Sequence, residues 1–152
     1  MPHSYFPNSH ALDKKPKATY TKAQRIRLGL PEDAFIFCCF NNSYKITPMM
    51  FECWMNILKE TEPSVLWLVV REETTKENLI KEAKKFNIDQ NRFVFSKPTS
   101  PDEYKSWFQY ADLYLDTYPY SSHTVALDAL WNNLPIVSLE GESFVSKVCG
   151  SF

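Results

Sequence analysis

Two short segments of this 152-residue chain carry side chains that are suited to binding an anion. The first segment, residues 40–45, reads Phe-Asn-Asn-Ser-Tyr-Lys and lies between an apolar run and a helical pattern. The ammonium group of Lys45 can reach a diphosphate as a point charge, and Asn42 can donate an amide hydrogen bond to the same anion. The alternative is that Lys45 is a solvated side chain in an asparagine-rich turn.

The second segment, residues 116–128, contains the expected start of a helix. The free N–H groups at a helix N-terminus attract anions, and His123 and Thr124 add side-chain donors for phosphate oxygens. His123 is also able to protonate a leaving group, since the ordinary pKa of an imidazole lies near neutrality. Ser122 is placed to cap the helix, and Asp128 can accept hydrogen bonds from ribose hydroxyl groups.

Each of these residues also has a purely structural alternative. Ser122 would do no more than cap the helix, His123 would be an exposed residue of its first turn, and Asp128 would be a carboxylate that favours the helix dipole. Trp107, in an earlier helix, can stack on a nucleobase, although packing in the core is the more common use of a tryptophan. No catalytic triad and no metal-ligand spacing is present, so we expect no catalytic residue, metal or cofactor in this chain.

The composition excludes several other kinds of protein. The formal net charge is -1, so no overall field attracts nucleic acid or an anionic membrane surface. With only 3 glycines, the chain lacks a glycine-rich phosphate loop. Cys38 and Cys39 lie in an apolar run and are interpreted as small, buried, reduced thiols. No apolar stretch reaches the roughly 20 residues that span a bilayer, and no signal peptide is recognisable, so we expect a cytoplasmic protein.

Strand-length apolar runs alternate with amphipathic helical patterns along the chain. The expected strands are residues 34–40, 65–70, 92–95, 113–115 and 135–139. This alternation predicts an α/β fold, a Rossmann-like, doubly wound parallel sheet of about five strands in the order 3-2-1-4-5. Ligands bind such sheets beyond the carboxyl ends of the strands, where the strand order reverses. That point lies between the first and fourth strands, which residues 41–45 and 116–124 follow.

Capping residues mark where several helices should begin. Thr74 or Thr75 is expected to cap the third helix. Ser100, followed by Pro101 and Glu103, is a strong start signal for the fourth helix. These positions predict that the third and fourth helices each begin shortly after a strand.

The segments together resemble the C-terminal lobe of the O-linked N-acetylglucosamine transferase family, which includes the SPINDLY-type proteins and bacterial relatives. The matching blocks occur in family order along nearly the whole chain. They are residues 1–6, His10, and residues 40–48, 54–58, 64–68, 91–96, 111–117, 123–124, 128–131, 134–137 and 141–142. The resemblance implies a GT-B glycosyltransferase, in which two Rossmann-like lobes enclose a nucleotide-sugar donor and no metal is needed.

The resemblance also implies roles for the residues that match. Lys45 matches a lysine that contacts the donor diphosphate, and Asn42 stands where the animal enzymes have a glutamine. His123 and Thr124 match residues that bind the phosphates, and Asp128 matches an acid of the donor site. The implied reaction is inverting transfer of N-acetylglucosamine from UDP-N-acetylglucosamine to Ser or Thr hydroxyl groups of protein acceptors.

Other positions depart from the pattern of the animal enzymes. Val125 replaces a threonine, and Pro101, Tyr104 and Trp107 replace a lysine, a histidine and an arginine near the base. The base pocket is therefore expected to be remodelled, which leaves open a relative that uses GDP-fucose or a UDP-hexose. A non-catalytic nucleotide- or protein-binding module of the same fold is a further alternative.

Residues 1–20 lack periodicity and carry three prolines, so we expect an extended segment there. The resemblance makes residues 21–152 a nucleotide-sugar-binding α/β lobe that is truncated at its C-terminus. The tetratricopeptide (TPR) repeats that capture protein substrates in the family and its N-terminal catalytic lobe are absent from the sequence. We therefore expect little or no sugar transfer by this chain alone, because positioning and water exclusion require the whole cleft.

Overall fold

The computed structural model describes residues 22–152, which fold around one five-stranded, fully parallel sheet. The strands are β1 (Phe35–Cys39), β2 (Ser64–Val69), β3 (Phe93–Ser96), β4 (Leu113–Leu115) and β5 (Ile136–Val137). Their order across the sheet is β3-β2-β1-β4-β5, which confirms the predicted topology. The extended segment expected at residues 1–20 lies outside the described residues.

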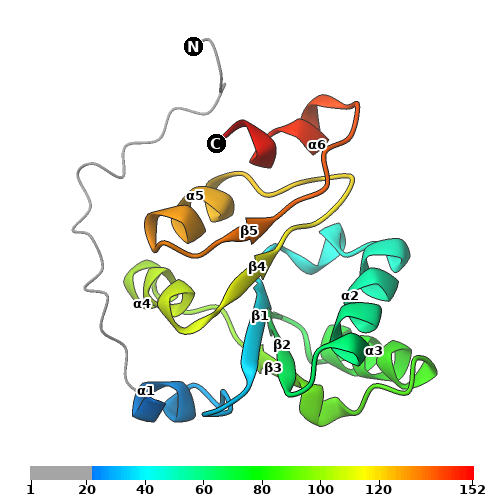
Figure 1. The fold of residues 1–152 in the computed structure, drawn as a ribbon, viewed down its shortest axis with the longest axis vertical. Coiled ribbons are helices and arrows are strands. Elements are labelled where there is room, and N and C mark those ends of the chain that lie inside the picture. Colours follow the sequence, from blue (N-terminus) through cyan, green and yellow to red (C-terminus); the bar gives the residue numbers. More distant parts are fainter. Residues whose placement is uncertain (1–21) are drawn as a thin grey trace.

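Helices cover both faces of this sheet. They are α1 (Lys22–Arg27), α2 (Pro48–Glu60), α3 (Glu73–Lys85), α4 (Pro101–Trp107), α5 (Thr124–Trp131) and α6 (Phe144–Lys147). Figure 1 shows α2 and α3 on one side of the sheet and α4 and α5 on the other. This is the doubly wound arrangement that right-handed crossovers between parallel strands produce.

The central strands β1 and β2 are buried because helices cover both of their faces. Ile36, Cys38, Leu66 and Trp67 have no exposed surface. The interpretation of Cys38 as a small buried apolar side chain is therefore confirmed. Burial also raises the pKa of the Cys38 thiol well above its ordinary value, which keeps the sulfur protonated.

Two helices begin with a side-chain cap, and the one at Ser100 confirms the start predicted there. The hydroxyl group of Thr47 accepts a hydrogen bond from the backbone N–H of Met50 at 3.3 Å, and Pro48 occupies the first position of α2. The hydroxyl group of Ser100 accepts a hydrogen bond from the backbone N–H of Glu103 at 3.4 Å. These caps fix the points at which α2 and α4 leave the carboxyl edge of the sheet.

Two boundaries differ from the prediction. Helix α3 begins at Glu73, so Thr74 and Thr75 lie within its first turn and neither of them caps it. Strand β5 keeps only two residues of the expected range 135–139, because its ladder with β4 is formed at just these two positions. The edge of the sheet is therefore shorter than the apolar run that encodes it.

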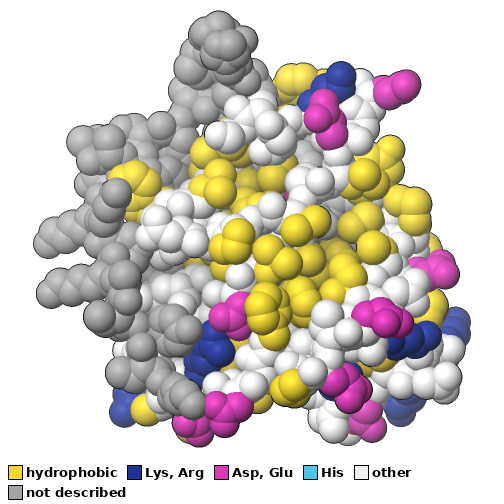
Figure 2. Space-filling view, viewed as in Figure 1, with side chains coloured by type: hydrophobic (Ala, Val, Ile, Leu, Met, Phe, Trp, Pro, Cys, Tyr) yellow, Lys and Arg dark blue, Asp and Glu magenta, His cyan; other side chains and the backbone are white. Residues whose placement is uncertain are grey.

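The described surface carries mixed charge on the face drawn in Figure 2. Hydrophobic side chains gather in the middle of this face, while Lys, Arg, Asp and Glu lie mostly around its rim. Exposed hydrophobic side chains near the edge strand β5 include Val137, Leu139 and Phe144. Among residues 22–152, no helix has the length and apolar character that a membrane crossing requires.

Candidate functional site

A buried carboxylate lies where the strand order reverses. Asp116 directly follows β4 and is 2% exposed. Its Oδ1 atom accepts hydrogen bonds from the backbone N–H groups of Thr117 (2.8 Å) and Ser122 (2.7 Å) and from the Ser122 hydroxyl group (2.6 Å). Its Oδ2 atom accepts a hydrogen bond from the hydroxyl group of Ser138, at 2.6 Å. Asp116 thus closes the loop that leads from β4 to α5 and ties it to the chain after β5.

Asn41 joins this loop to the neighbouring strand β1. Its side-chain Nδ2 donates to the hydroxyl oxygens of Thr117 (2.8 Å) and Ser122 (2.6 Å), and it lies 3.4 Å from Oδ1 of Asp116. The Tyr114 hydroxyl group shares a further hydrogen bond of 3.1 Å with the hydroxyl group of Ser122. The two loops that the sequence singled out are therefore held together by one buried polar network.

Lys45 comes from the first of these loops and reaches the second. It ends a short 3-10 turn, Ser43–Lys45, and its Nζ donates to the backbone carbonyl of Ser121 at 3.0 Å. The same ammonium group lies 3.8 Å from the centre of the Tyr120 ring. Partial burial lowers the pKa of Lys45, and the negative charge of Asp116 opposes this decrease.

His123 contacts the same tyrosine. Its imidazole centroid is 5.3 Å from that of Tyr120, with the two ring planes tilted by 58°. Partial burial lowers the pKa of His123, the positive charge of Lys45 lowers it further, and Asp116 acts in the opposite direction. The structure therefore brings Lys45 and His123 together, although they lie 78 positions apart in the sequence.

Ser122 has a different role from the expected helix cap. Helix α5 begins at Thr124, and its N-cap position is His123, whose side chain makes no capping bond. Ser122 is fully buried, and its hydroxyl group is used by Asp116, Asn41 and Tyr114. Burial of Asp116 explains the difference, because a buried carboxylate needs donors more than an exposed helix end does. Thr124 is exposed at the first position of α5.

Asn42 faces a cavity next to this polar network. The cavity measures about 310 Å³ and lies beyond the carboxyl ends of the central strands. Its lining residues are Asn41, Asn42, Ser43, Val69, Arg71, Pro98, Thr99, Pro101 and Tyr104. Asp128 is buried on α5, and its charge is the second cause, after burial, of a raised pKa of the Tyr104 hydroxyl group. Of the predicted residues, Lys45 and His123 therefore lie around Tyr120 and Asn42 lines the cavity, whereas Asp128 is not among the residues that line it.

Trp107 belongs to neither group as the structure places it. It is 4% exposed and packs against Phe40 and Trp67, with ring centroids 6.0 Å and 5.6 Å away. Its buried Nε1 has no hydrogen-bond partner. This placement matches the core-packing alternative, and no open face of the indole is available to a base. Tyr104, which is only partly buried and lines the cavity, offers the more accessible ring.

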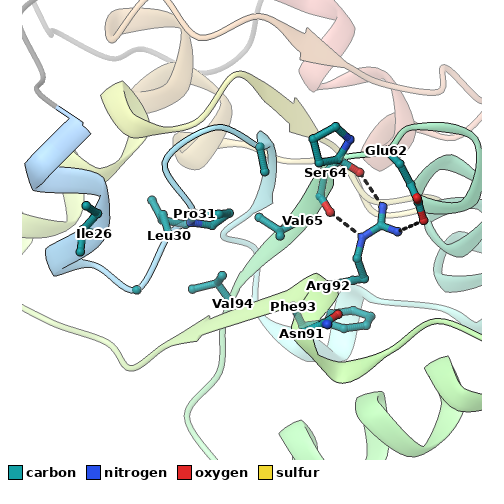
Figure 3. Close-up of a pocket in the computed structure, with 13 residues that line it drawn as sticks. Ile26, Leu30, Pro31, Glu62, Ser64, Val65, Asn91, Arg92, Phe93 and Val94 are labelled. Carbon is teal, nitrogen blue, oxygen red and sulfur yellow. Dashed lines mark hydrogen bonds and ion pairs between the residues drawn. The ribbon is translucent and has the colours of Figure 1, made fainter.

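A larger cavity of about 650 Å³ lies at the opposite, amino-terminal edge of the sheet (Figure 3). It is lined mainly by apolar side chains, among them Leu30, Val65 and Val94. The guanidinium group of Arg92 is occupied within the fold: it donates to the carbonyl groups of Leu58, Thr61 and Ser64, to the hydroxyl group of Ser64 and to Glu62. This cavity is large, but it offers few polar groups that are free to bind a ligand. The carboxyl edge of the sheet is therefore the better candidate for a polar ligand.

Sequence reasoning named three important residues only as parts of loops. Asn41 and Asp116 form the network, and Tyr120 contacts both predicted phosphate-binding side chains. The available signal was position, because Asn41 and Asp116 are polar residues that follow buried strands at the carboxyl edge. Among residues 22–152, no group of three or more His, Cys, Asp or Glu side chains could hold a metal ion.

The fold and the converging loops define an α/β protein of the doubly wound class, in which ligands bind at the carboxyl edge of the sheet. Within that class, the chain belongs to glycosyl transferase family 41, whose sequence profile matches residues 6–152. A solved structure of an O-GlcNAc transferase mutant from Thermobaculum terrenum has a similar fold. Its TM-score is 0.75 at 27% sequence identity, over 78% of this chain and 23% of that chain.

Two similar curated proteins, from a worm and a plant, carry closely related names. A UDP-N-acetylglucosamine–peptide N-acetylglucosaminyltransferase of Caenorhabditis elegans is 36% identical over 84% of this chain and 11% of its own length. The probable UDP-N-acetylglucosamine–peptide N-acetylglucosaminyltransferase SEC of Arabidopsis thaliana is 32% identical over 99% of this chain and 16% of its own length. The chain thus spans less than a fifth of these two relatives.

Replacing Asp116 by asparagine should destabilise the fold. An asparagine has one neutral acceptor oxygen in place of two charged ones, so the buried donors of Thr117, Ser122 and Ser138 would lose the carboxylate charge and one of its two acceptor atoms. We expect the free energy of unfolding, measured with guanidinium chloride, to fall by about 2–4 kcal/mol. The exposed control Glu140→Gln should change it by less than about 0.5 kcal/mol. Equal stability of both variants would show that the network contributes little.

The proximity of Lys45 and His123 can be measured without a ligand. The pKa of His123, followed by the NMR signals of its imidazole, should lie below the ordinary value of 6.5. Lys45→Met should raise this pKa, because it removes a nearby positive charge. Asp116→Asn should lower it, because it removes a negative charge. An unperturbed pKa in the wild-type protein, or no response to Lys45→Met, would contradict the geometry.

Proposed function

We propose that this chain is the donor-binding lobe of a protein O-glycosyltransferase and that it binds UDP-N-acetylglucosamine at the carboxyl edge of its sheet. Membership of glycosyl transferase family 41 supports the reaction class. The names of the worm and plant relatives describe a UDP-N-acetylglucosamine donor and a peptide acceptor. In this proposal the full protein transfers N-acetylglucosamine to Ser or Thr side chains, by way of regions that this chain does not include.

The observation that carries the proposal is the convergence of Lys45 and His123. They come from loops that follow β1 and β4, and both side chains lie against Tyr120. Because the strand order reverses between β1 and β4, this is the place where doubly wound sheets bind ligands. Partial burial lowers the pKa of Lys45 and of His123, because water stabilises their charged forms less than it does those of free side chains. An anionic ligand would stabilise the charged forms in place of the missing water.

The proposed site would act on the leaving group of the reaction. Transfer of the sugar breaks the bond to the diphosphate and leaves additional negative charge on its terminal phosphate. Lys45, His123 and the backbone N–H groups at the start of α5 would stabilise this charge as it develops, without a metal. A fixed network beneath them, centred on Asp116, avoids the cost of reorganising these groups during the reaction.

The cavity beside Asn42 would receive the nucleoside. Its volume of about 310 Å³ suits a base and part of a ribose, and Tyr104 offers a ring against which a base can stack. Asp128 is buried on α5 close enough to Tyr104 for its charge to raise the pKa of that hydroxyl group, and in this proposal it would accept a ribose hydroxyl group once the nucleoside is bound. Pro101 and Tyr104 line this cavity, and they are two of the positions at which the resemblance implies a remodelled base pocket, so guanine should be tested as well as uracil.

Calorimetric titration of the chain with UDP and with GDP tests the proposal. We expect UDP to bind, and we expect Lys45→Ala and His123→Ala each to weaken it by about 10- to 100-fold, as loss of a charge-assisted hydrogen bond would. Lys81→Ala, an exposed lysine on α3, is the matched control and should bind as the wild type does. Addition of EDTA should leave the affinity unchanged.

Each other outcome of this titration is informative. Binding of GDP in preference to UDP would show that the donor is a GDP-sugar, with the same residues binding its diphosphate. Binding of UDP that is insensitive to both substitutions would contradict the site. Failure of both nucleotides to bind would contradict the donor-binding role of this chain and favour a non-catalytic module of the same fold.

A further inference from the structure

We infer that Tyr120 is a positioning residue of this site, whose ring orients the Lys45 ammonium group and the His123 imidazole toward one diphosphate. The inference rests on the proposed function, but it concerns a residue that neither the motif nor the family resemblance singled out. It depends on three observations: the contacts of the ring, its exposure, and the way in which its backbone is held.

The ring of Tyr120 contacts both groups that are proposed to bind phosphate. The Lys45 Nζ lies 3.8 Å from the ring centroid, well within the range of about 6 Å in which a cation is attracted to the face of an aromatic ring. The same Nζ donates to the Ser121 carbonyl at 3.0 Å. An ammonium group held from two directions has lost much of its rotational freedom, so it is set in place before a ligand arrives.

His123 packs against the same ring. The centroid distance of 5.3 Å and the tilt of 58° fall within the geometries that aromatic rings prefer. Lys45 and His123 carry like charges when both are protonated, and the Lys45 charge indeed lowers the pKa of His123. The π-electrons of Tyr120 offer each of them a partner, so that both can be retained on one side of the loop.

Core packing does not explain the position of this ring. Tyr120 is 38% exposed, whereas Tyr114, which belongs to the same region, is fully buried. The backbone beneath the ring is nevertheless fixed, because the Tyr120 carbonyl accepts a hydrogen bond of 2.7 Å from the hydroxyl group of Thr117. Thr117 in turn accepts from Asn41, so the buried network holds an exposed aromatic ring above Lys45.

A double-mutant cycle tests the inference. Tyr120→Leu removes the aromatic face and should weaken UDP binding about two- to fivefold, as loss of an exposed cation–π contact would. Tyr120→Phe keeps that face and should bind within about twofold of the wild type. In a Lys45→Met background, Tyr120→Leu should have a smaller effect on affinity than in the wild type, because only the contact of the ring with His123 remains to be lost. Tyr44→Leu, which removes a more exposed tyrosine next to Lys45, is the matched control and should leave affinity unchanged.

A second measurement does not depend on ligand binding. The ring current of Tyr120 should shift the NMR signals of the Lys45 ε-methylene protons upfield in the free protein. Tyr120→Phe should keep this shift and Tyr120→Leu should abolish it. Ordinary Lys45 chemical shifts in the wild type, or UDP affinity that is unchanged in Tyr120→Leu, would overturn the role of Tyr120 but not the proposed function. Failure of the wild-type chain to bind UDP would instead overturn the proposed function.

Discussion

The organisation of the carboxyl edge depends on one buried carboxylate. Asp116 receives hydrogen bonds from two backbone N–H groups and from the hydroxyl groups of Ser122 and Ser138, and the described chain pairs it with no lysine or arginine at ion-pair distance. A charge in this position is stable only while every donor is in place. The requirement fixes the course of the loop between β4 and α5, and with it the positions of Tyr120, the Ser121 carbonyl and His123.

That constraint connects the fold to the proposed chemistry. The parallel order β2-β1-β4-β5 brings the ends of β1 and β4 side by side, so a residue of either loop can reach the other. Asn41 makes this connection inside the protein, and Lys45 makes it at the surface. The negative charge of Asp116 raises the pKa of both Lys45 and His123, so it favours the protonated forms that are proposed to bind phosphate.

The fold could be predicted from the sequence more completely than the arrangement of side chains in the site. Long apolar runs such as residues 65–70 identify buried parallel strands, and the reversal of strand order then selects the two loops without knowledge of any side chain. Side-chain direction was harder to predict. Ser122 has the sequence context of a helix cap, but its hydroxyl group donates to the buried carboxylate of Asp116 instead. The helical spacing of Trp107 does not say which face of α4 packs against the core. No sequence motif points to Tyr120, because its proposed role depends on a contact with Lys45, which lies 75 positions away in the sequence.

The most direct test of the account is where a nucleotide binds. Two-dimensional ¹H–¹⁵N NMR spectra of the ¹⁵N-labelled chain would be recorded during titration with UDP, and the larger apolar cavity around Val65 and Arg92 would serve as an internal control. The account predicts that the largest shift changes occur in residues 41–45 and 117–124 and at Tyr104, with little change at the amino-terminal edge of the sheet. Changes concentrated around Val65 and Arg92, or none in the two loops, would contradict it.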